Sequence, residues 1–158
     1  MTEDFDGFYA AHVRALTAQL YASTGDLAEA QDIVQEAFCR AWSRWPRLAE
    51  YEDPLAWVRR VSWNLAMSRW RRMRTAARFL AGQRPEYAEG PSVDRVALVA
   101  ALARLPVAQR RALILHYLAG LTTAELAQEC GAAESTVRSW LHRGRTTLMT
   151  QLAEEVSR

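Results

Sequence analysis

The chain has 158 residues, a length that suits one domain or two small ones. Half of the residues are hydrophobic, so the chain can bury a core, and wholesale disorder is excluded. The formal net charge is only +2 although the chain contains 20 basic residues, all of them arginine, so the total charge alone does not indicate a nucleic-acid-binding protein. The N-terminus is acidic and no apolar run reaches the roughly 18 residues of a membrane span, so we expect neither a signal peptide nor a transmembrane segment.

The spacing of apolar residues predicts helices nearly throughout the chain and no strand. Residues 4–21 place aromatic and aliphatic side chains three and four positions apart, as on one face of a helix, and Gly25 ends this helix. Asp26 is suited to cap a second helix that runs to about Trp45, with Glu29 as the reciprocal half of a capping box. Pro46 ends that helix, and a loop is predicted to follow it.

A third long helix is predicted from Pro54 to residue 74, because proline fits the first turn of a helix and Asp53 can cap it. Residues 75–94 contain two glycines, two prolines and few large apolar side chains, which is typical of a flexible linker. The sequence therefore predicts an all-α protein with two small helical domains, at residues 1–74 and 95–158, joined by a linker at 75–94.

The second of these domains contains the pattern of a helix-turn-helix. A helix is predicted over residues 106–118, and residues 122–125, with the sequence TTAE, form a capping box that starts a short helix. Gly131 lies at the turn, and a longer helix is predicted over residues 134–154.

Two features weaken that last helix. The position before it is occupied by Ala132 or Ala133, neither of which can accept a capping hydrogen bond, at a cost of about 1 kcal/mol relative to serine. Gly144 lies inside the helix, where glycine lowers helix stability.

The charge is distributed unevenly along the chain. Residues 1–50 carry four arginines against eight acidic residues, a net charge of −4, whereas residues 51–74 carry six arginines against two acids, a net charge of +4. Residues 75–94 have a net charge of −1, and residues 95–158 have +3. An acidic block followed by basic blocks indicates one surface for a basic protein partner and two for phosphates, although ordinary solvated helix faces would account for the charges equally well.

No pattern of catalytic or metal-binding residues is present. The cysteines, Cys39 and Cys130, form no CxxC motif and suit neither a zinc site nor a disulfide framework, so we expect two buried thiols in a reducing cytoplasm. His12, His116 and His142 lie on three different predicted helices without a cysteine or carboxylate pair at metal-binding spacing. A phosphate-binding glycine loop, a nucleophile elbow and an HExxH motif are also missing, so we expect no enzyme activity, no metal and no cofactor.

Three segments resemble conserved regions of the extracytoplasmic-function sigma factors, which belong to the sigma-70 family of RNA polymerase subunits. Residues 26–42 (DLAEAQDIVQEAFCRAW) resemble the second conserved region, and residues 57–72 (WVRRVSWNLAMSRWRR) resemble the promoter-melting helix that follows it. Residues 105–115, together with residues 121–145, resemble the fourth region. The order, the spacing and the total length all agree with that family.

The resemblance implies that the polar face of the helix after Asp26 binds the clamp of core RNA polymerase. Acidic and amide side chains on this face can pair with arginines of a partner helix and set its orientation. The residues expected to bind the polymerase are Asp32, Gln35, Glu36 and Arg40.

The resemblance further implies that the 54–74 helix reads and melts the −10 element. Aromatic faces can replace lost base stacking at about 1–3 kcal/mol per base, while arginines hold the phosphates. The loop at residues 47–53 matches the pocket for an extruded base, although it departs from the commoner loop that contains Arg-Gly. We expect Trp57 in the core and the −10 DNA at Tyr51, Arg60, Trp63, Asn64, Arg69, Arg71 and Arg72.

The final helix is expected to enter the major groove at the −35 element with its N-terminal turns. Its arginines could read guanine or bind only phosphate, and Trp140 either touches a thymine methyl or, as we favour, packs against neighbouring helices. The residues expected to meet the −35 DNA are Ser135, Thr136, Arg138, Ser139, His142 and Arg143.

The expected function is that of a cytoplasmic sigma factor that binds the clamp and flap of core RNA polymerase and promoter DNA. An anti-sigma protein is a further partner that the resemblance admits, and no membrane contact is expected. Two alternatives stay open. One is a helix-turn-helix regulator that acts without polymerase, although residues 1–74 show no receiver-like alternation of strands and helices. The other is a degenerate sigma paralogue that acts as a protein-binding adaptor, which the arginines and tryptophans of residues 57–74 disfavour.

Overall fold

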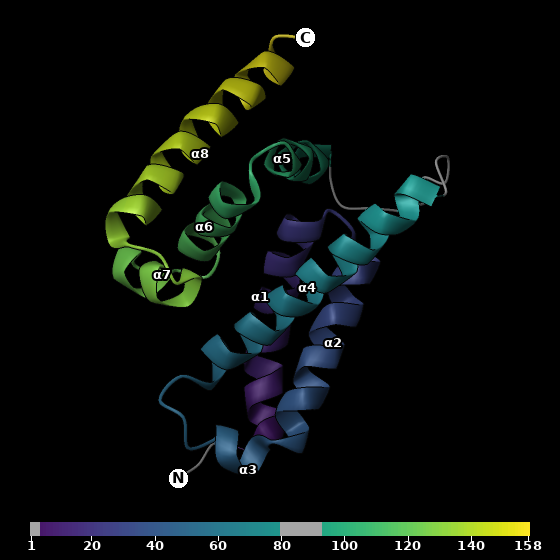
Figure 1. Ribbon diagram of the computed structural model, residues 1–158, viewed down its shortest axis with the longest axis vertical. Helices are drawn as coiled ribbons and strands as arrows, with labels where there is room; N and C mark the ends of the chain where they lie inside the picture. The colour runs from purple at the N-terminus through teal and green to yellow at the C-terminus, as the bar shows by residue number, and fades with distance from the viewer. Residues whose placement is uncertain (1–3, 80–92) are drawn as a thin grey trace.

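The computed structural model describes residues 4–79 and 93–158, and within these residues it contains eight helices and no strand (Figure 1). The prediction of an all-α protein is therefore confirmed. The helices are α1 (Phe5–Thr24), α2 (Leu27–Ser43), α3 (Trp45–Leu48), α4 (Pro54–Phe79), α5 (Val93–Ala103), α6 (Val107–Tyr117), α7 (Thr123–Cys130) and α8 (Glu134–Val156).

Two hydrophobic cores divide the described residues into two helical domains. The first domain packs α1 to α4 around side chains such as Ile33, Phe38 and Val58, all of which are buried. The second packs α5 to α8 around Leu126 and Val137. Figure 1 shows α6 and α7 of the second domain beside α1 and α4 of the first, so the two domains also contact each other. Most of the predicted linker lies outside the described residues.

The junction between α1 and α2 is formed by a glycine and a shared set of caps. Gly25 adopts a left-handed conformation, with φ of 76°, and ends α1 as predicted. The Asp26 carboxylate accepts a hydrogen bond from the Glu29 backbone N–H at 3.1 Å. The predicted reciprocal bond from Glu29 is not formed, because the Thr24 hydroxyl accepts the Asp26 N–H at 3.3 Å instead. Burial first, and Asp26 second, raise the pKa of the Glu29 carboxyl.

The boundaries of the next two helices differ from the prediction. Pro46 does not simply end α2, since it lies in the first turn of the separate short helix α3. The Asp53 carboxylate caps α4 as predicted, accepting the Ala56 N–H at 3.1 Å. However, α4 continues to Phe79, through residues assigned to the linker. The reason is that no glycine or proline follows until Gly82, so nothing stops the helix at residue 74.

The helix-turn-helix forms as predicted in α7 and α8. Thr122 accepts the Glu125 N–H at 3.2 Å, and the Glu125 carboxylate accepts the Thr122 N–H at 3.1 Å, which completes the capping box. The bond from the Thr122 backbone is the main cause that lowers the pKa of Glu125. Gly131 takes the left-handed turn with φ of 64°, and Ala133 provides no side-chain cap to α8.

The glycine inside α8 has a packing role. A Cβ atom at Gly144 would lie 2.9 Å from Cδ1 of Leu113 in α6, closer than carbon atoms pack without displacement. The cost of glycine to the helix is therefore offset by the close approach of α6 to α8 that it permits.

Candidate nucleic-acid interface

The outer face of α2 carries the four residues predicted to bind polymerase. Asp32 and Gln35 are exposed, and the Gln35 side-chain amide donates a hydrogen bond to the Tyr9 hydroxyl at 2.7 Å. Glu36 pairs with Arg40 of its own helix at 2.9 Å and with Arg69 of α4 at 3.3 Å. The structure thus brings the four together, with Asp32 and Gln35 presented to solvent and Glu36 engaged in an ion-pair network.

The same face continues into residues that the sequence analysis did not select. The expectation of a buried thiol was wrong for Cys39, which lies on the outer face of α2 and is exposed. Trp42 is 68% exposed. Trp42 lies seven residues after Gln35, which is two helical turns, so both side chains project on one side of α2. That spacing, combined with the polar residues around it, is the signal that would have identified Trp42 as a surface residue.

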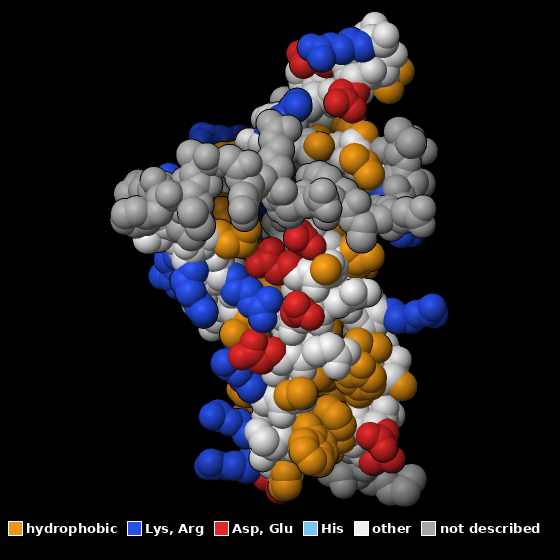
Figure 2. Space-filling model, turned by 90° about the vertical axis from the view of Figure 1, so that its right-hand side faces the viewer, with side chains coloured by type: hydrophobic (Ala, Val, Ile, Leu, Met, Phe, Trp, Pro, Cys, Tyr) orange, Lys and Arg blue, Asp and Glu red, His pale blue; other side chains and the backbone are white. Residues whose placement is uncertain are grey.

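Exposed polar side chains also line one side of α4. Arg60, Asn64 and Arg71 recur at intervals of four and seven residues, and all three are exposed. Arg72 is exposed and donates to the Ser68 hydroxyl at 3.2 Å, whereas Arg69 is held by Glu36. The arrangement offers several guanidinium groups and one amide to a polyanion along a single helix. Figure 2 shows basic side chains along the left edge of one face of the molecule, with acidic side chains nearer its middle.

A cavity of about 130 Å³ lies where the 47–53 loop meets α4. Tyr51, half exposed, and Trp57, half-buried against the first core, provide aromatic surface on its wall. Trp57 is thus core-facing on one side, as predicted, and lines a cavity on the other. Two aromatic side chains beside guanidinium groups suit a planar, polar ring. The full lining is Arg44, Arg47, Leu48, Tyr51 and Trp57.

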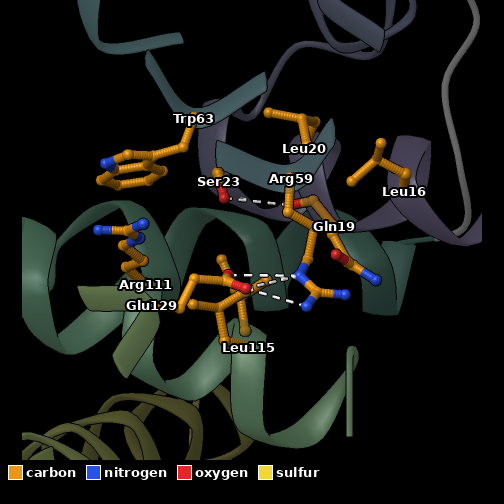
Figure 3. A pocket seen from close by; sticks show the side chains of 10 residues that line it. Leu16, Gln19, Leu20, Ser23, Arg59, Trp63, Arg111, Leu115 and Glu129 are labelled. Atoms are coloured by element: carbon orange, nitrogen blue, oxygen red, sulfur yellow. Dashed lines mark hydrogen bonds and ion pairs between the residues drawn. The ribbon is translucent and has the colours of Figure 1, made fainter. Parts of the chain in front are cut away.

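Trp63 is separated from the exposed residues of α4. It is half-buried and faces the second domain, where the guanidinium carbon of Arg111 in α6 lies 4.5 Å from the centre of its ring (Figure 3). The predicted −10 residues are therefore not all brought together: Arg60, Asn64, Arg71 and Arg72 face solvent, while Trp63 lies in the contact between the domains.

Beside Trp63 lies a buried ion pair that the sequence analysis did not predict. The Arg59 guanidinium of α4 donates to the Glu129 carboxylate of α7 at 2.9 and 3.0 Å, and the two side chains are 9% and 5% exposed (Figure 3). Gln19 of α1 is buried next to this pair, and its side-chain oxygen has no hydrogen-bond partner among the described residues. The sequence contained one indication of this burial: Arg59 lies four residues after Leu55 and seven before Ala66, so it shares a helix face with apolar residues.

The first turns of α8 present most of the residues predicted to read the −35 element. Ser135, Thr136, His142 and Arg143 are exposed, and Ser139 is half-buried. Arg138 is exposed and pairs with Glu134 at 2.9 Å.

Two further side chains fix this helix. Glu134 also accepts a hydrogen bond from the Thr123 hydroxyl at 2.8 Å, which ties α8 to α7. Trp140 is half-buried and packs against the second core, as the sequence analysis favoured.

The surroundings of the histidines and cysteines are defined by the residues that they contact and by their burial. His12 contacts the Phe8 ring edge-on, and Nδ1 of His116 lies 2.8 Å from the Leu121 carbonyl oxygen. Burial raises the pKa of the half-buried Cys130 thiol. Within residues 4–79 and 93–158, no three metal-binding side chains are clustered, and none of the helices combines the length and apolar character needed to cross a membrane.

Two family models match the chain. The model described as "Sigma-70 region 2" matches residues 8–76, which include α2 and nearly all of α4. The model described as "Sigma-70, region 4" matches residues 95–148, which include α6, α7 and the first turns of α8. The buried residues of the first core all lie within the first match, and those of the second core lie within the second match except for Ala22 of α1.

The chain is similar to curated and solved proteins over nearly its whole length. It is 32% identical to the ECF RNA polymerase sigma factor SigL of Mycobacterium tuberculosis, over 92% of this chain and 87% of that protein. It is 31% identical to the probable RNA polymerase sigma factor RfaY of Xanthomonas campestris pv. campestris, over 88% of this chain but only 38% of that protein. The structure resembles that of the sigma factor RpoE in complex with the anti-sigma factor NepR from Bartonella quintana, with a TM-score of 0.81, 26% identity and coverage of 95% and 97% of the two chains.

Proposed function

The chain belongs to the extracytoplasmic-function sigma factors of the sigma-70 family, and we propose that its two domains divide promoter reading between α4 and α8. As a sigma factor, it binds core RNA polymerase and promoter DNA and directs promoter-specific initiation of transcription. The two alternative functions, a polymerase-independent regulator and a binding adaptor, gain no support from the similar proteins. We further propose that it acts in the cytoplasm and has no catalytic activity of its own.

The observation that carries the proposal for α4 is the row formed by Arg60, Asn64 and Arg71 on one exposed side of the helix. Guanidinium groups on this row can follow the phosphates of a separated strand, while the Asn64 amide can donate to and accept from a base edge. The cavity beside Tyr51 and Trp57 lies at the N-terminal end of the same helix. A base extruded from the strand would enter this cavity and stack on an aromatic ring.

For α8, the exposure of Arg138 and Arg143 supports docking in the major groove at the −35 element. Arg138 must exchange its ion pair with Glu134 for a DNA contact. Arg143 has no ion pair among the described residues and reaches DNA without that exchange.

For α2, the exposed Asp32 and Gln35 support binding of the polymerase clamp through charge-assisted hydrogen bonds. The similar RpoE structure is a complex with an anti-sigma factor. By analogy, we include an anti-sigma protein among the proposed partners of this chain.

The proposal is tested by comparing Trp63→Ala and Asn64→Ala in holoenzyme on duplex and pre-melted promoters. Both substitutions should reduce open-complex formation on the duplex, as measured by permanganate footprinting. A pre-melted bubble should largely restore open-complex formation by Trp63→Ala. An aromatic wedge offsets the free-energy cost of unstacking the bases, and in the bubble that cost has already been met. Asn64→Ala should stay defective on the bubble, because a lost base contact persists in single-stranded DNA.

A substitution outside the proposed site provides the control. Gln128→Ala changes an exposed residue of α7 and should behave like the unaltered protein on both templates. Equal defects of Trp63→Ala and Asn64→Ala on duplex and bubble would contradict the assigned roles.

A further inference from the structure

The cavity at the 47–53 loop is lined mainly by residues that recur at helical spacing. Arg47, Leu48 and Tyr51 lie three, four and seven residues after Arg44, which places them on one face of a helical turn. The Leu48 N–H donates to the Arg44 carbonyl oxygen at 2.9 Å, and the Tyr51 N–H donates to the Leu48 carbonyl oxygen at 3.0 Å. These bonds continue the turn of α3 as far as Tyr51, and Trp57 from the start of α4 completes the wall.

Both guanidinium groups of this lining are available to a ligand. Arg44 and Arg47 are exposed, and neither forms an ion pair with the described residues, whereas Arg59 and Arg69 of the same domain are held by carboxylates. No carboxylate or amide side chain lines the cavity, and a guanidinium carries only hydrogen-bond donors. Apart from the Tyr51 hydroxyl, the polar side chains of the lining can therefore only donate, and they favour a ligand that is rich in acceptors.

The volume of the cavity limits the size of the ring that it can take. At about 130 Å³, it is slightly smaller than an engineered cavity of about 150 Å³ that binds benzene. A single six-membered ring therefore fits against Tyr51 and Trp57, whereas the fused second ring of a purine would extend beyond the cavity. Because Tyr51 is half exposed, the sugar and phosphate of an extruded nucleotide can stay outside. The size of the cavity thus favours a pyrimidine.

The two pyrimidines of DNA differ in how well they match this lining. Thymine presents two carbonyl oxygens, O2 and O4, on either side of a single N–H, so each guanidinium can donate to one oxygen. Cytosine carries an amino group in place of O4, and a guanidinium that faced this group would oppose one donor to another. The remaining wall is apolar, because Leu48, 2% exposed, offers a hydrophobic surface to the 5-methyl group that only thymine carries.

We propose that this cavity selects a thymine of the −10 element, with Arg44 and Arg47 as the residues that determine specificity. The two arginines donate to O2 and O4, and Leu48 contacts the methyl group. Tyr51, the more exposed of the two aromatic side chains, provides the stacking surface. This selection rests on the proposed entry of an extruded base into the cavity, and it adds which base enters and which side chains choose it.

The first experiment varies the DNA and leaves the protein intact. Holoenzyme is bound to a pre-melted promoter that has been identified by mapping transcript starts, and the non-template thymines of its −10 element are replaced one at a time. At one position, uracil should weaken binding about fourfold, because the contact of one methyl group is lost. Cytosine at the same position should weaken binding about tenfold, because its amino group faces a donor.

The second experiment removes both guanidinium groups. The double variant Arg44→Ala with Arg47→Ala should bind thymine and cytosine at that position about equally, because no donor is left to distinguish O4 from the amino group. The matched control is Arg14→Ala with Arg104→Ala, which removes two exposed arginines outside the cavity. The control loses the same charge, so it can weaken binding to all sequences, but it should keep the tenfold preference for thymine.

An abasic nucleotide tests the capture of a base separately from its identity. It is moved through the non-template −10 strand, and at the captured position it should weaken binding of the unaltered chain about fivefold or more, because a stacked base is lost. Tyr51→Ala should bind the intact strand more weakly and should be nearly insensitive to the abasic nucleotide at that position, since the stacking surface is already missing.

The outcomes distinguish the choice of base from its capture. A Tyr51-dependent position that prefers a purine or cytosine, or an undiminished preference for thymine in the double arginine variant, would overturn the selection of thymine by Arg44 and Arg47. The capture of a base would still stand in both cases. If no position showed a loss that depends on Tyr51, the proposed entry of a base into the cavity would itself fail, and the selection of thymine with it.

Discussion

Single residues decide how closely the helices of the second domain approach, and Gly144 is the clearest case. Gly144→Ala would add a methyl group 2.9 Å from Leu113, whose side chain is buried and has little room to move. Alanine would gain up to about 1 kcal/mol of helix propensity, but overpacking costs about 1–3 kcal/mol. We therefore expect a net loss of about 1 kcal/mol in the free energy of unfolding, measured by urea titration.

Gly7→Ala is the matched control for that substitution. Gly7 lies in the first turn of α1 and is exposed, so its replacement adds helix propensity without a packing cost. It should leave stability unchanged or raise it. If Gly144→Ala were also stabilising, the close contact between α6 and α8 would not be the reason for glycine at this position.

The two arginines of α8 should differ in what they contribute to −35 binding. If Arg143 contacts only phosphate, Arg143→Ala should weaken binding to all sequences and reduce the slope of log affinity against log salt by about 1. If Arg138 reads a base, Arg138→Ala should cost about 1–3 kcal/mol and relax the preference at one position. Titration of holoenzyme with promoter variants at several salt concentrations measures both effects. Identical responses to salt and to sequence would contradict this division.

At the scale of the element, the polar face of α2 is the part of the proposed polymerase interface that can be tested alone. The double substitution Asp32→Ala with Gln35→Ala should weaken holoenzyme formation at least tenfold, since two polar contacts of about 1 kcal/mol each are lost. Helicity by circular dichroism should be retained because both side chains are exposed, although the bond from Gln35 to Tyr9 is also lost.

The control for α2 removes one acid and one amide elsewhere. Gln128→Ala with Glu154→Ala changes exposed residues of α7 and α8 and should leave polymerase binding intact. If the α2 double variant bound core polymerase as tightly as the unaltered chain, the polar face of α2 would not be part of the polymerase interface.

Local signals in the sequence were sufficient to predict most of the elements. Glycines at positions 25 and 131, the Thr122 capping box and the Asp53 cap act within a few residues, and each appears in the structure where it was expected. The predictions of helix ends were wrong where two residues compete for the same capping or terminating role. At Asp26 the Thr24 hydroxyl takes the place of Glu29, and at Pro46 proline starts a turn after ending another helix.

The site was less predictable, because surface exposure depends on how helices pack. Periodicity placed Asp32, Gln35, Arg60 and Asn64 on polar faces, and all four are exposed. It did not show that Trp63 faces the second domain, since that contact joins residues far apart in the sequence. The partner of Arg59 lies 70 residues away, and a single sequence does not reveal such a pair.

At the scale of the whole molecule, the fold is two small helical cores whose contact surface includes part of α4, the helix proposed to melt the −10 DNA. Each core places one candidate DNA-reading helix at its surface, α4 in the first and α8 in the second. In the described residues the two domains contact each other, through α1 against α5 and α6 and through the Arg59–Glu129 ion pair.

Reconstitution of the chain with core RNA polymerase, followed by mapping of transcript starts on genomic DNA, tests the central claim most directly. We predict discrete start sites, each preceded by a common pair of elements near −35 and −10. Transcripts from these sites should vanish when the chain is omitted and should be reduced when it carries Asp32→Ala with Gln35→Ala. Sequence-specific DNA binding without polymerase-dependent transcripts would contradict the claim and indicate a separate helix-turn-helix regulator. Polymerase binding without initiation at any promoter would contradict it in the other direction and indicate an adaptor.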